Sequence, residues 1–254
     1  MERITSAKNP MVQRLRELKN AKARRESGLF LVEGEVMIRE GMKCGLKIRE
    51  IVADETREAF AGEFSGFARA AIVTRSLLES ICDTKTPQGV CAAFEIPAPI
   101  CPEELPDRIV ALDGVQDPGN VGTIWRTADA AGFQGILLGS GSADPLSPKV
   151  MRSAMGSGFR LPFAHAEKLA ESLLELRRRG YHVFASDLSG ADFYSRPDSG
   201  EKFVLVIGNE ARGISDAVRE AADCRVKLPM RGGAESLNAA VAAGIMMYEL
   251  MRGR

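Results

Sequence analysis

The sequence predicts an α/β protein in which a small N-terminal layered domain precedes a larger domain built on a parallel sheet. Short apolar runs of strand length alternate with stretches of helical periodicity along the whole chain. After residue 108 the apolar runs are continuous, which is typical of strands covered by helices on both faces. Four of the twelve prolines fall within residues 96–107, where neither a helix nor a central strand can run. This stretch is interpreted as a linker between domains 1–95 and 108–254.

The N-terminal domain is expected to have an α/β/α layering, because its predicted strands and helices alternate. A basic helix near residues 8–26 is followed by a short apolar strand at residues 29–32. Further helices are predicted near residues 33–44, 56–64 and 76–81, and further strands at residues 48–53, 70–74 and 89–94.

The C-terminal domain alternates more clearly, and a parallel sheet of this kind binds ligands at the carboxyl ends of its strands. Strands are predicted at residues 108–112, 135–138, 181–186, 203–207 and 225–228. Helices are predicted near residues 120–131, 148–155, 167–179, 215–222 and 237–251.

Composition excludes several classes of protein. Apolar residues make up 45% and charged residues 27% of the 254, as in ordinary globular proteins. The longest apolar run, Ala239–Met247, is half of the roughly 18 residues that a membrane span needs, and the first ten residues lack a signal-peptide core. Five cysteines without a C-x-x-C pair and two histidines argue against a disulfide framework and a metal centre. We therefore expect a cytoplasmic protein without a metal.

Charge is balanced overall but uneven along the chain. The 34 basic residues equal the 34 acidic ones, so the global basic field of many nucleic-acid binders is absent. Residues 1–30 nevertheless hold eight Lys/Arg and three Glu, a net charge of +5. This segment is either a solvated helix face or a basic arm that lies on phosphates.

Three segments of the C-terminal domain carry polar residues next to predicted strand ends. In residues 112–132, a turn leads to Asn120, a good helix N-cap, and Arg126 lies off the apolar face of the helix. In residues 203–215, an apolar strand breaks at Gly208 into a loop with Glu210 and Gly213, which does not match the G-x-G-x-x-G dinucleotide fingerprint.

The third segment runs from residue 226 to Tyr248. A loop with Gly232, Gly233 and Ser236 leads into a helix in which Asn238 is almost the only early polar residue. A helix that is apolar nearly all round must be buried on most sides, so we expect it to pack on its own sheet and on a second subunit. On this expectation Met247→Glu would disrupt a dimer.

Together, the three segments resemble the SpoU (TrmH-like) family of RNA ribose 2′-O-methyltransferases, within the SPOUT superfamily. The resemblance covers roughly residues 108–254. Three N-terminal segments also resemble the substrate-binding domain of this family: Ile4–Pro10, Phe30–Gly34 and Asp83–Val90.

The resemblance implies a trefoil knot in the C-terminal domain, S-adenosylmethionine as methyl donor, a homodimer, and an RNA-binding role for residues 1–95. The knot would not follow from periodicity, because chains rarely thread through loops. The family positions that hold the donor correspond to Ile207, Gly208, Leu228, Met230, Ser236 and Leu237.

The resemblance also implies the catalytic residues Arg126, Asn120, Glu210, Ser236 and Asn238. The arginine matching Arg126 is usually assigned as general base, although arginine side chains, with a pKa above about 12, normally stay protonated. Clamping an RNA phosphate and polarising the 2′-hydroxyl is the alternative role. Asn120 and Glu210 would position Arg126 and the ribose, while Ser236 and Asn238 would order the donor loop.

Other functions remain open at this point. A non-catalytic RNA-binding protein of the same fold would be expected to lack Arg126, Glu210 or Asn238, and all three are present. A dehydrogenase would need the glycine fingerprint. A base-directed methyltransferase is disfavoured because the Asp117–Asn120 and Ser236–Asn238 motifs resemble those of the ribose-directed branch. Ribosomal RNA is favoured over transfer RNA as substrate.

Overall fold

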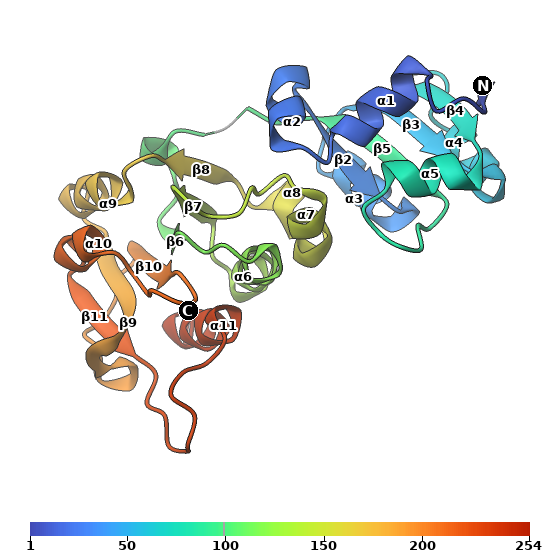
Figure 1. The fold of residues 1–254 in the computed structure, drawn as a ribbon. Coiled ribbons are helices and arrows are strands. Elements are labelled where there is room, and N and C mark those ends of the chain that lie inside the picture. The colour runs from blue at the N-terminus through green and yellow to red at the C-terminus, as the bar shows by residue number, and fades with distance from the viewer. Residues whose placement is uncertain (99) are drawn as a thin grey trace. The chain divides into compact units, whose positions relative to one another are not determined.

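The computed structural model describes residues 1–98 and 100–254, and their contacts group them into two compact units. The first unit contains residues 1–98 and also residues 144–159, which lie far along the chain. The second contains the described residues 100–143 and 160–254. By its contacts, the segment 144–159 is therefore part of the N-terminal unit, although its place in the sequence falls within the predicted domain 108–254. Figure 1 shows the elements of each unit.

The first unit is built on a mixed five-stranded sheet with the order β1-β4-β3-β5-β2. Strand β4 is parallel to both of its neighbours, whereas β5 is antiparallel to β3 and β2. The strands are β1 (Glu2–Ile4), β2 (Leu29–Glu33), β3 (Ile48–Ala53), β4 (Arg69–Val73) and β5 (Val90–Glu95). The helices are α1 (Pro10–Glu17), α2 (Ala21–Ser27), α3 (Glu35–Lys43), α4 (Glu58–Gly62) and α5 (Arg75–Ile81).

Two helix layers cover this sheet. Apolar residues of α1 and α5, including Met11 and Leu78, form one core with the sheet. On the other face α3 approaches so closely at Gly41 that an added Cβ would lie 3.2 Å from the Phe94 ring. The helices α7 (Pro148–Ala154) and α8 (Ser157–Arg160) come from the later segment, and the Phe159 ring lies 6.4 Å from that of Phe30.

Residues 1–30 are folded into the first unit. They supply β1, α1, α2 and the start of β2. Asn20 divides the predicted single basic helix in two, because its side chain accepts a hydrogen bond from the Lys22 backbone N–H and caps α2. Arg24 is buried and donates to the carbonyls of Leu18 and Lys19 and to Asp144. Removing these residues would therefore remove part of the core as well as charge.

The second unit is built on a six-stranded sheet with the order β11-β9-β10-β6-β7-β8, in which every pairing is parallel. Its strands are β6 (Arg108–Asp113), β7 (Gly135–Gly139), β8 (Phe163–Ala166), β9 (His182–Asp192), β10 (Phe203–Gly208) and β11 (Cys224–Lys227). Its helices are α6 (Pro118–Ala131), α9 (Leu169–Arg178), α10 (Asp216–Ala221) and α11 (Ala239–Leu250). Short 3₁₀ turns lie at Glu55–Arg57 in the first unit and at Pro102–Glu104 and Phe193–Ser195 in the second.

Helices cover both faces of the parallel sheet, so the predicted α/β fold class is confirmed. Figure 1 shows α9 and α10 on one face and α6 and α11 on the other. Leu173 of α9 and Val218 of α10 join one core cluster. A Cβ added to Gly244 of α11 would lie 3.4 Å from Cγ2 of Thr127 on α6, so these two helices are in van der Waals contact at this point. The threading of the chain into a knot stays a prediction.

In the part of the chain that the structure describes, no helix is long and apolar enough to cross a membrane. Likewise, residues 1–98 and 100–254 bring together no group of three His, Cys, Asp or Glu side chains that could hold a metal ion.

Candidate functional site

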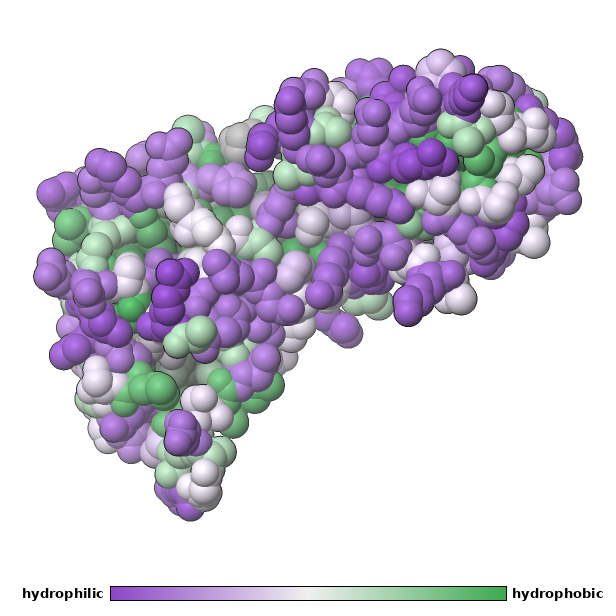
Figure 2. Space-filling view, viewed as in Figure 1, coloured by the Kyte–Doolittle hydropathy of each residue, from purple (hydrophilic) through white to green (hydrophobic). Residues whose placement is uncertain are grey.

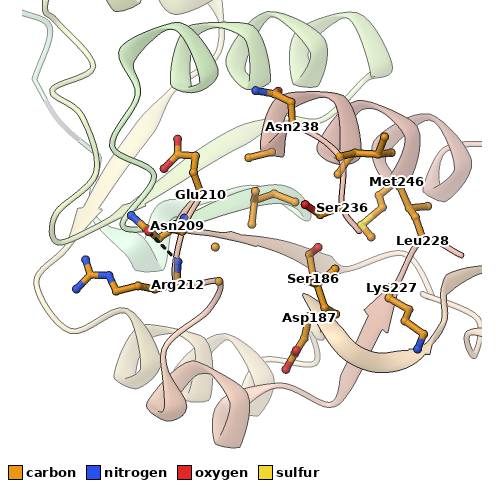
Figure 3. A pocket seen from close by; sticks show the side chains of 18 of the residues that line it. Ser186, Asp187, Asn209, Glu210, Arg212, Lys227, Leu228, Ser236, Asn238 and Met246 are labelled. Carbon is orange, nitrogen blue, oxygen red and sulfur yellow. Dashed lines mark hydrogen bonds between the residues drawn. The ribbon is translucent and has the colours of Figure 1, made fainter. Parts of the chain in front are cut away.

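A cavity of about 520 Å³ lies at the carboxyl ends of β9, β10 and β11. This is where an open parallel sheet offers a binding crevice. Figure 3 shows its side chains coming from three elements, with Ser186 and Asp187 on β9, Glu210 after β10 and Leu228 after β11. Leu228 and Met230 give it an apolar side, to which Met246 of α11 adds. Cavities of roughly 300–1,000 Å³ with a few polar groups accommodate small molecules.

All six residues predicted to hold the donor line this one cavity: Ile207, Gly208, Leu228, Met230, Ser236 and Leu237. Three of the predicted catalytic residues, Glu210, Ser236 and Asn238, line it too. Asn120 and Arg126 lie on α6 and are not part of the lining. The second and third segments therefore converge on this cavity, whereas Asn120 and Arg126 of the first segment lie outside its lining.

Gly208 is required by the chain's own backbone. A Cβ at this position would lie 2.3 Å from the carbonyl carbon of Gly213 and 2.4 Å from the nitrogen of Ile214. Gly213 has a φ of +69°, which L side chains rarely adopt. The buried Asn209 closes the loop, because its Oδ1 accepts from the backbone N–H groups of Ala211 and Arg212. These glycines shape a tight loop beside the cavity.

A chain of hydrogen bonds joins Glu210 to the start of α11. The Nδ2 of Asn120 donates to Oε1 of Glu210 at 2.9 Å. The Nδ2 of Asn238 donates to Oδ1 of Asn120, also at 2.9 Å. Oδ1 of Asn238 then accepts from the backbone N–H of Ala240 at 2.9 Å and caps α11. In Figure 3 the carboxylate of Glu210 and the amide of Asn238 both point toward α6, the helix that carries Asn120.

This chain, called the amide relay below, fixes the orientation of both asparagines. The Glu210 carboxylate can only accept hydrogen bonds, and the backbone N–H at the other end can only donate. Each amide must therefore present its NH₂ toward Glu210 and its oxygen toward α11. The relay connects the three sequence segments, since Asn120, Glu210 and Asn238 each come from a different one.

Glu210 also anchors the turn before α6. The backbone N–H groups of Gln116 and Asp117 each donate to its carboxylate at 3.2 Å. Burial alone would raise the pKa of Glu210, but the hydrogen bonds from Asn120 and from backbone N–H groups outweigh it and lower the pKa. Glu210 is thus held as a carboxylate, which suits an anchoring role.

Arg126 is exposed on α6, and no carboxylate within the described residues forms an ion pair with it. On the same helix Asp129 pairs with Arg160 instead. Arg126 thus presents a free cation that is available to an anion outside its own chain.

Sequence reasoning missed Asp187, which also lines the cavity. Its carboxylate accepts from the Ser189 backbone N–H and hydroxyl and from Arg219 Nε at 3.0 Å. Burial raises the pKa of Asp187, but the bonds from Ser189 and Arg219 outweigh this and lower it. The signal was available, because Asp187 directly follows a predicted strand that ends at residue 186.

Comparisons with known proteins cover both units. The family model described as the SpoU rRNA methylase family matches residues 107–248, and the MRM3-like substrate binding domain matches residues 9–92. A Bacillus subtilis relative, the 23S rRNA (guanosine(2553)-2′-O)-methyltransferase RlmP, is 37% identical over 98% of this chain and 99% of its own length.

Solved structures agree with these matches. The AdoMet-bound rRNA methyltransferase of Sinorhizobium meliloti superposes with a TM-score of 0.88 at 34% identity, covering 99% of this chain and 97% of that one. The SpoU methyltransferase AviRb of Streptomyces viridochromogenes, in complex with AdoMet, gives 0.84 at 32% identity over 96% and 98% of the two chains. The resemblance carried by the three segments is confirmed, and the chain belongs to the SpoU rRNA methylase family.

Proposed function

We propose that the protein transfers a methyl group from S-adenosylmethionine to a ribose 2′-hydroxyl of ribosomal RNA. The observation that carries this proposal is the convergence of all six predicted donor residues on one cavity, beside the amide relay. The names of the B. subtilis and S. meliloti relatives favour ribosomal RNA as the substrate class. The cytoplasm stays the predicted compartment.

The cavity has features that fit the donor. Leu228 and Met230 offer an apolar wall for an adenine, and the hydroxyl of Ser236 has no hydrogen-bond partner among the described residues. When bound, S-adenosylmethionine supplies a methyl group made electrophilic by its sulfonium. The residues that would hold it are the six named above, with Asp187 and Arg219 as a charged pair in the same lining.

The protein's own task is to align the two substrates and to activate a weak nucleophile. The amide relay keeps the turn before α6 and the start of α11 in fixed positions around the donor cavity. The free guanidinium of Arg126 clamps the RNA phosphate beside the target ribose and polarises the 2′-hydroxyl. Because Arg126 does not line the cavity of its own chain, we assign it to the site of a second subunit.

An apolar stripe that runs from Leu237, just before α11, along that helix supports this homodimer. Leu237, Val241, Ile245 and Tyr248 are 38%, 51%, 38% and 57% exposed and follow one another at helical spacing. Figure 2 shows apolar residues reaching the surface around α11, within a surface that is mostly hydrophilic. Contiguous exposed apolar surface of this kind marks interaction sites.

Met247 is not a suitable residue for a test of the dimer. Met247 is 0% exposed in the single chain, so Met247→Glu would place a charge in the core of its own subunit. The prediction that this variant acts through the interface was wrong. Val241 and Tyr248 lie on the exposed stripe and are the residues to change.

Two measurements on the full chain test the proposed function. Titration calorimetry should show binding of S-adenosylmethionine without RNA. Mass-spectrometric mapping of 2′-O-methyl nucleosides should find a ribosomal RNA site that is lost in cells without the protein. An unchanged ribosomal RNA pattern with a lost transfer RNA site would move the substrate to transfer RNA, and no change in either would contradict the activity.

A further inference from the structure

A second cavity, of about 270 Å³, lies wholly within the first unit. Two of its walls come from the segments Phe30–Gly34 and Asp83–Val90, which the proposed chemistry does not use. The third wall is α7 with Met155, from the segment 144–159 that joins this unit. Two N-terminal segments that carry the family resemblance therefore meet at one hollow.

The walls are mainly apolar. Leu31 and Val32 of β2, Met37 of α3 and Met151 of α7 all contribute to the lining. Val36 lines it while being 74% exposed, so Val36 lies at the mouth. Drug-sized ligands occupy roughly 300–1,000 Å³, so this smaller cavity suits a group the size of one or two fused rings.

Met155 is held at the cavity by an unusual backbone. Its φ of 48° is positive, and it is the one non-glycine residue in the described chain with this property. Such conformations cost free energy and persist where the surroundings enforce them, often at ligand sites. Here the conformation ends α7 and places the Met155 side chain, which is 53% exposed, in the lining.

Polar groups lie at one end of the cavity. Oε1 of Glu33 accepts from the Asp83 backbone N–H at 2.6 Å, and Oε2 accepts from the Thr84 hydroxyl at 2.8 Å. Each oxygen keeps a second lone pair for a ligand donor. The side-chain amide of Gln88 has no hydrogen-bond partner among the described residues. It packs directly against Gly34, where an added Cβ would lie only 2.7 Å from Gln88 Oε1.

Two cations belong to the segments that form these walls. Lys85 belongs to the Asp83–Val90 segment, is exposed, and has no ion pair with any residue that the structure describes. Arg152 lines the cavity and donates to Asp83 at 3.1 Å while staying partly exposed. An apolar slot with a hydrogen-bonding end and adjacent cations matches the chemistry of a nucleotide, with base inside and phosphate outside.

We infer that this cavity takes one unstacked nucleobase of the RNA substrate, with an N–H edge of the base donating to Glu33. The inference rests on the proposed function, because it assumes that the first unit binds RNA. Proteins read RNA sequence mostly at unpaired nucleotides, whose bases are splayed out and hydrogen-bonded at their edges. Apolar side chains can hold such a base by contact with its faces.

Methionine methyl groups allow a direct test in the full chain. The protein is labelled with ¹³C-methyl methionine, so that Met37, Met151 and Met155 report on this cavity while Met230 and Met246 report on the donor cavity. The probes are single-stranded hexanucleotides of adenosine, cytidine or uridine, an alternating guanosine–uridine hexanucleotide, and S-adenosylmethionine. We expect the oligonucleotides to shift the first three signals, with a preference among bases.

Val36→Trp should block the mouth from an exposed position without disturbing the core. We expect it to remove the shifts at Met37, Met151 and Met155 and to weaken oligonucleotide binding about tenfold, the loss of one base contact. Met42→Trp is the matched control, since Met42 is an exposed residue of the same helix outside this lining. Glu33→Gln should change the preferred base.

The outcomes separate the two proposals. Oligonucleotide shifts that are absent, or that persist equally in Val36→Trp, would overturn the base-binding inference. An unchanged base preference in Glu33→Gln would contradict the role of its carboxylate. If S-adenosylmethionine does not shift the Met230 and Met246 signals of the wild-type protein, that result would instead contradict the proposed methyl transfer, whatever happens at the base cavity.

Discussion

Both units of the protein pair many of their arginines within the fold, but the unpaired cations of the second unit gather on or near the segments that carry its site. In the first unit most arginines are engaged within the fold: Arg3 pairs with Glu55 and Glu58, and Arg39 with Glu35 and Glu63. In the second unit four cations on or near the functional segments have no carboxylate partner among the described residues. They are Arg126, Arg212, Lys227 and Arg231.

This difference indicates that the net charge of a segment is a poor guide to how many of its cations are free. Residues 1–30 have the larger charge excess, but internal partners engage much of it. A cation without a partner is already free to meet a phosphate, whereas a paired one must first give up its carboxylate. The second unit is therefore where the removal of a single cation should have the larger effect.

The sharpest test of this contrast is Arg126→Ala. We expect methyl transfer to fall by about 100- to 1,000-fold, as when one group that stabilises developing charge is removed. Binding of S-adenosylmethionine, measured by calorimetry, should not change, because Arg126 does not line the donor cavity. Arg178→Ala is the control, since Arg178 belongs to the same unit and pairs with the exposed Glu175. Near-normal activity in Arg126→Ala would remove this residue from the site.

Val241→Glu tests whether that cation acts across subunits. A charge on the exposed stripe of α11 should separate the dimer, and methyl transfer should fall about 100-fold as the reacting groups lose alignment. Sedimentation velocity should show the variant at the 27.5 kDa chain mass. Leu174→Glu, at a 39% exposed residue of α9, should leave the dimer intact. A wild-type protein that sediments as a single chain at micromolar concentration would end the shared-site proposal.

Glu210→Gln tests the amide relay. The new NH₂ group would replace one of the two carboxylate oxygens and face the backbone N–H of Gln116 or of Asp117, each of which now donates to a different oxygen. We expect the free energy of unfolding to fall by about 1 kcal/mol, limited by the exposure of this side chain. The folded-state pKa of Glu210 is lowered, so its contribution is complete above the ordinary carboxyl value of 4.5. The Tm difference between variant and wild type should therefore be constant near neutral pH and shrink as the pH falls below that value. A difference that does not change with pH would exclude the carboxylate as its origin.

The smallest effect is expected from the first unit. Lys8 and Arg25 are exposed cations without ion pairs in the described chain, and changing both to Gln should reduce the salt slope of RNA binding by roughly 0.7–0.9 per lost phosphate contact. Arg3→Gln, which removes a paired cation, should leave the slope unchanged. Equal slopes in all three proteins would favour the solvated-face interpretation of residues 1–30.

Much of the second unit could be predicted from sequence, because buried parallel strands appear as continuous apolar runs. The predicted strand at residues 203–207 became β10, and the helix at residues 237–251 became α11. The strands β1 and β8 were missed, since they have only three and four residues and Glu2–Ile4 and Phe163–Ala166 show no long pattern.

The sequence predicted which residues belong to the site better than it predicted how these residues are arranged. Motif resemblance selected Asn120, Glu210 and Asn238, but their hydrogen-bonded order depends on a fold that brings distant segments together. Gly208 was predicted only as a residue that holds the donor, and the structure shows that it also makes room for the loop at Gly213. Sequence spacing does not contain that contact, because the two residues meet only when the loop closes.

The position of residues 144–159 has a consequence for how this protein can be dissected. In the chain they follow β7 and precede β8, yet α7 packs against β2 of the first unit. A fragment that starts at the linker would keep α7 and lose the strand that it covers. Chimaeras with other members of the family should therefore exchange residues 1–98 and 144–159 as one module, although two cuts in the chain are needed to obtain it.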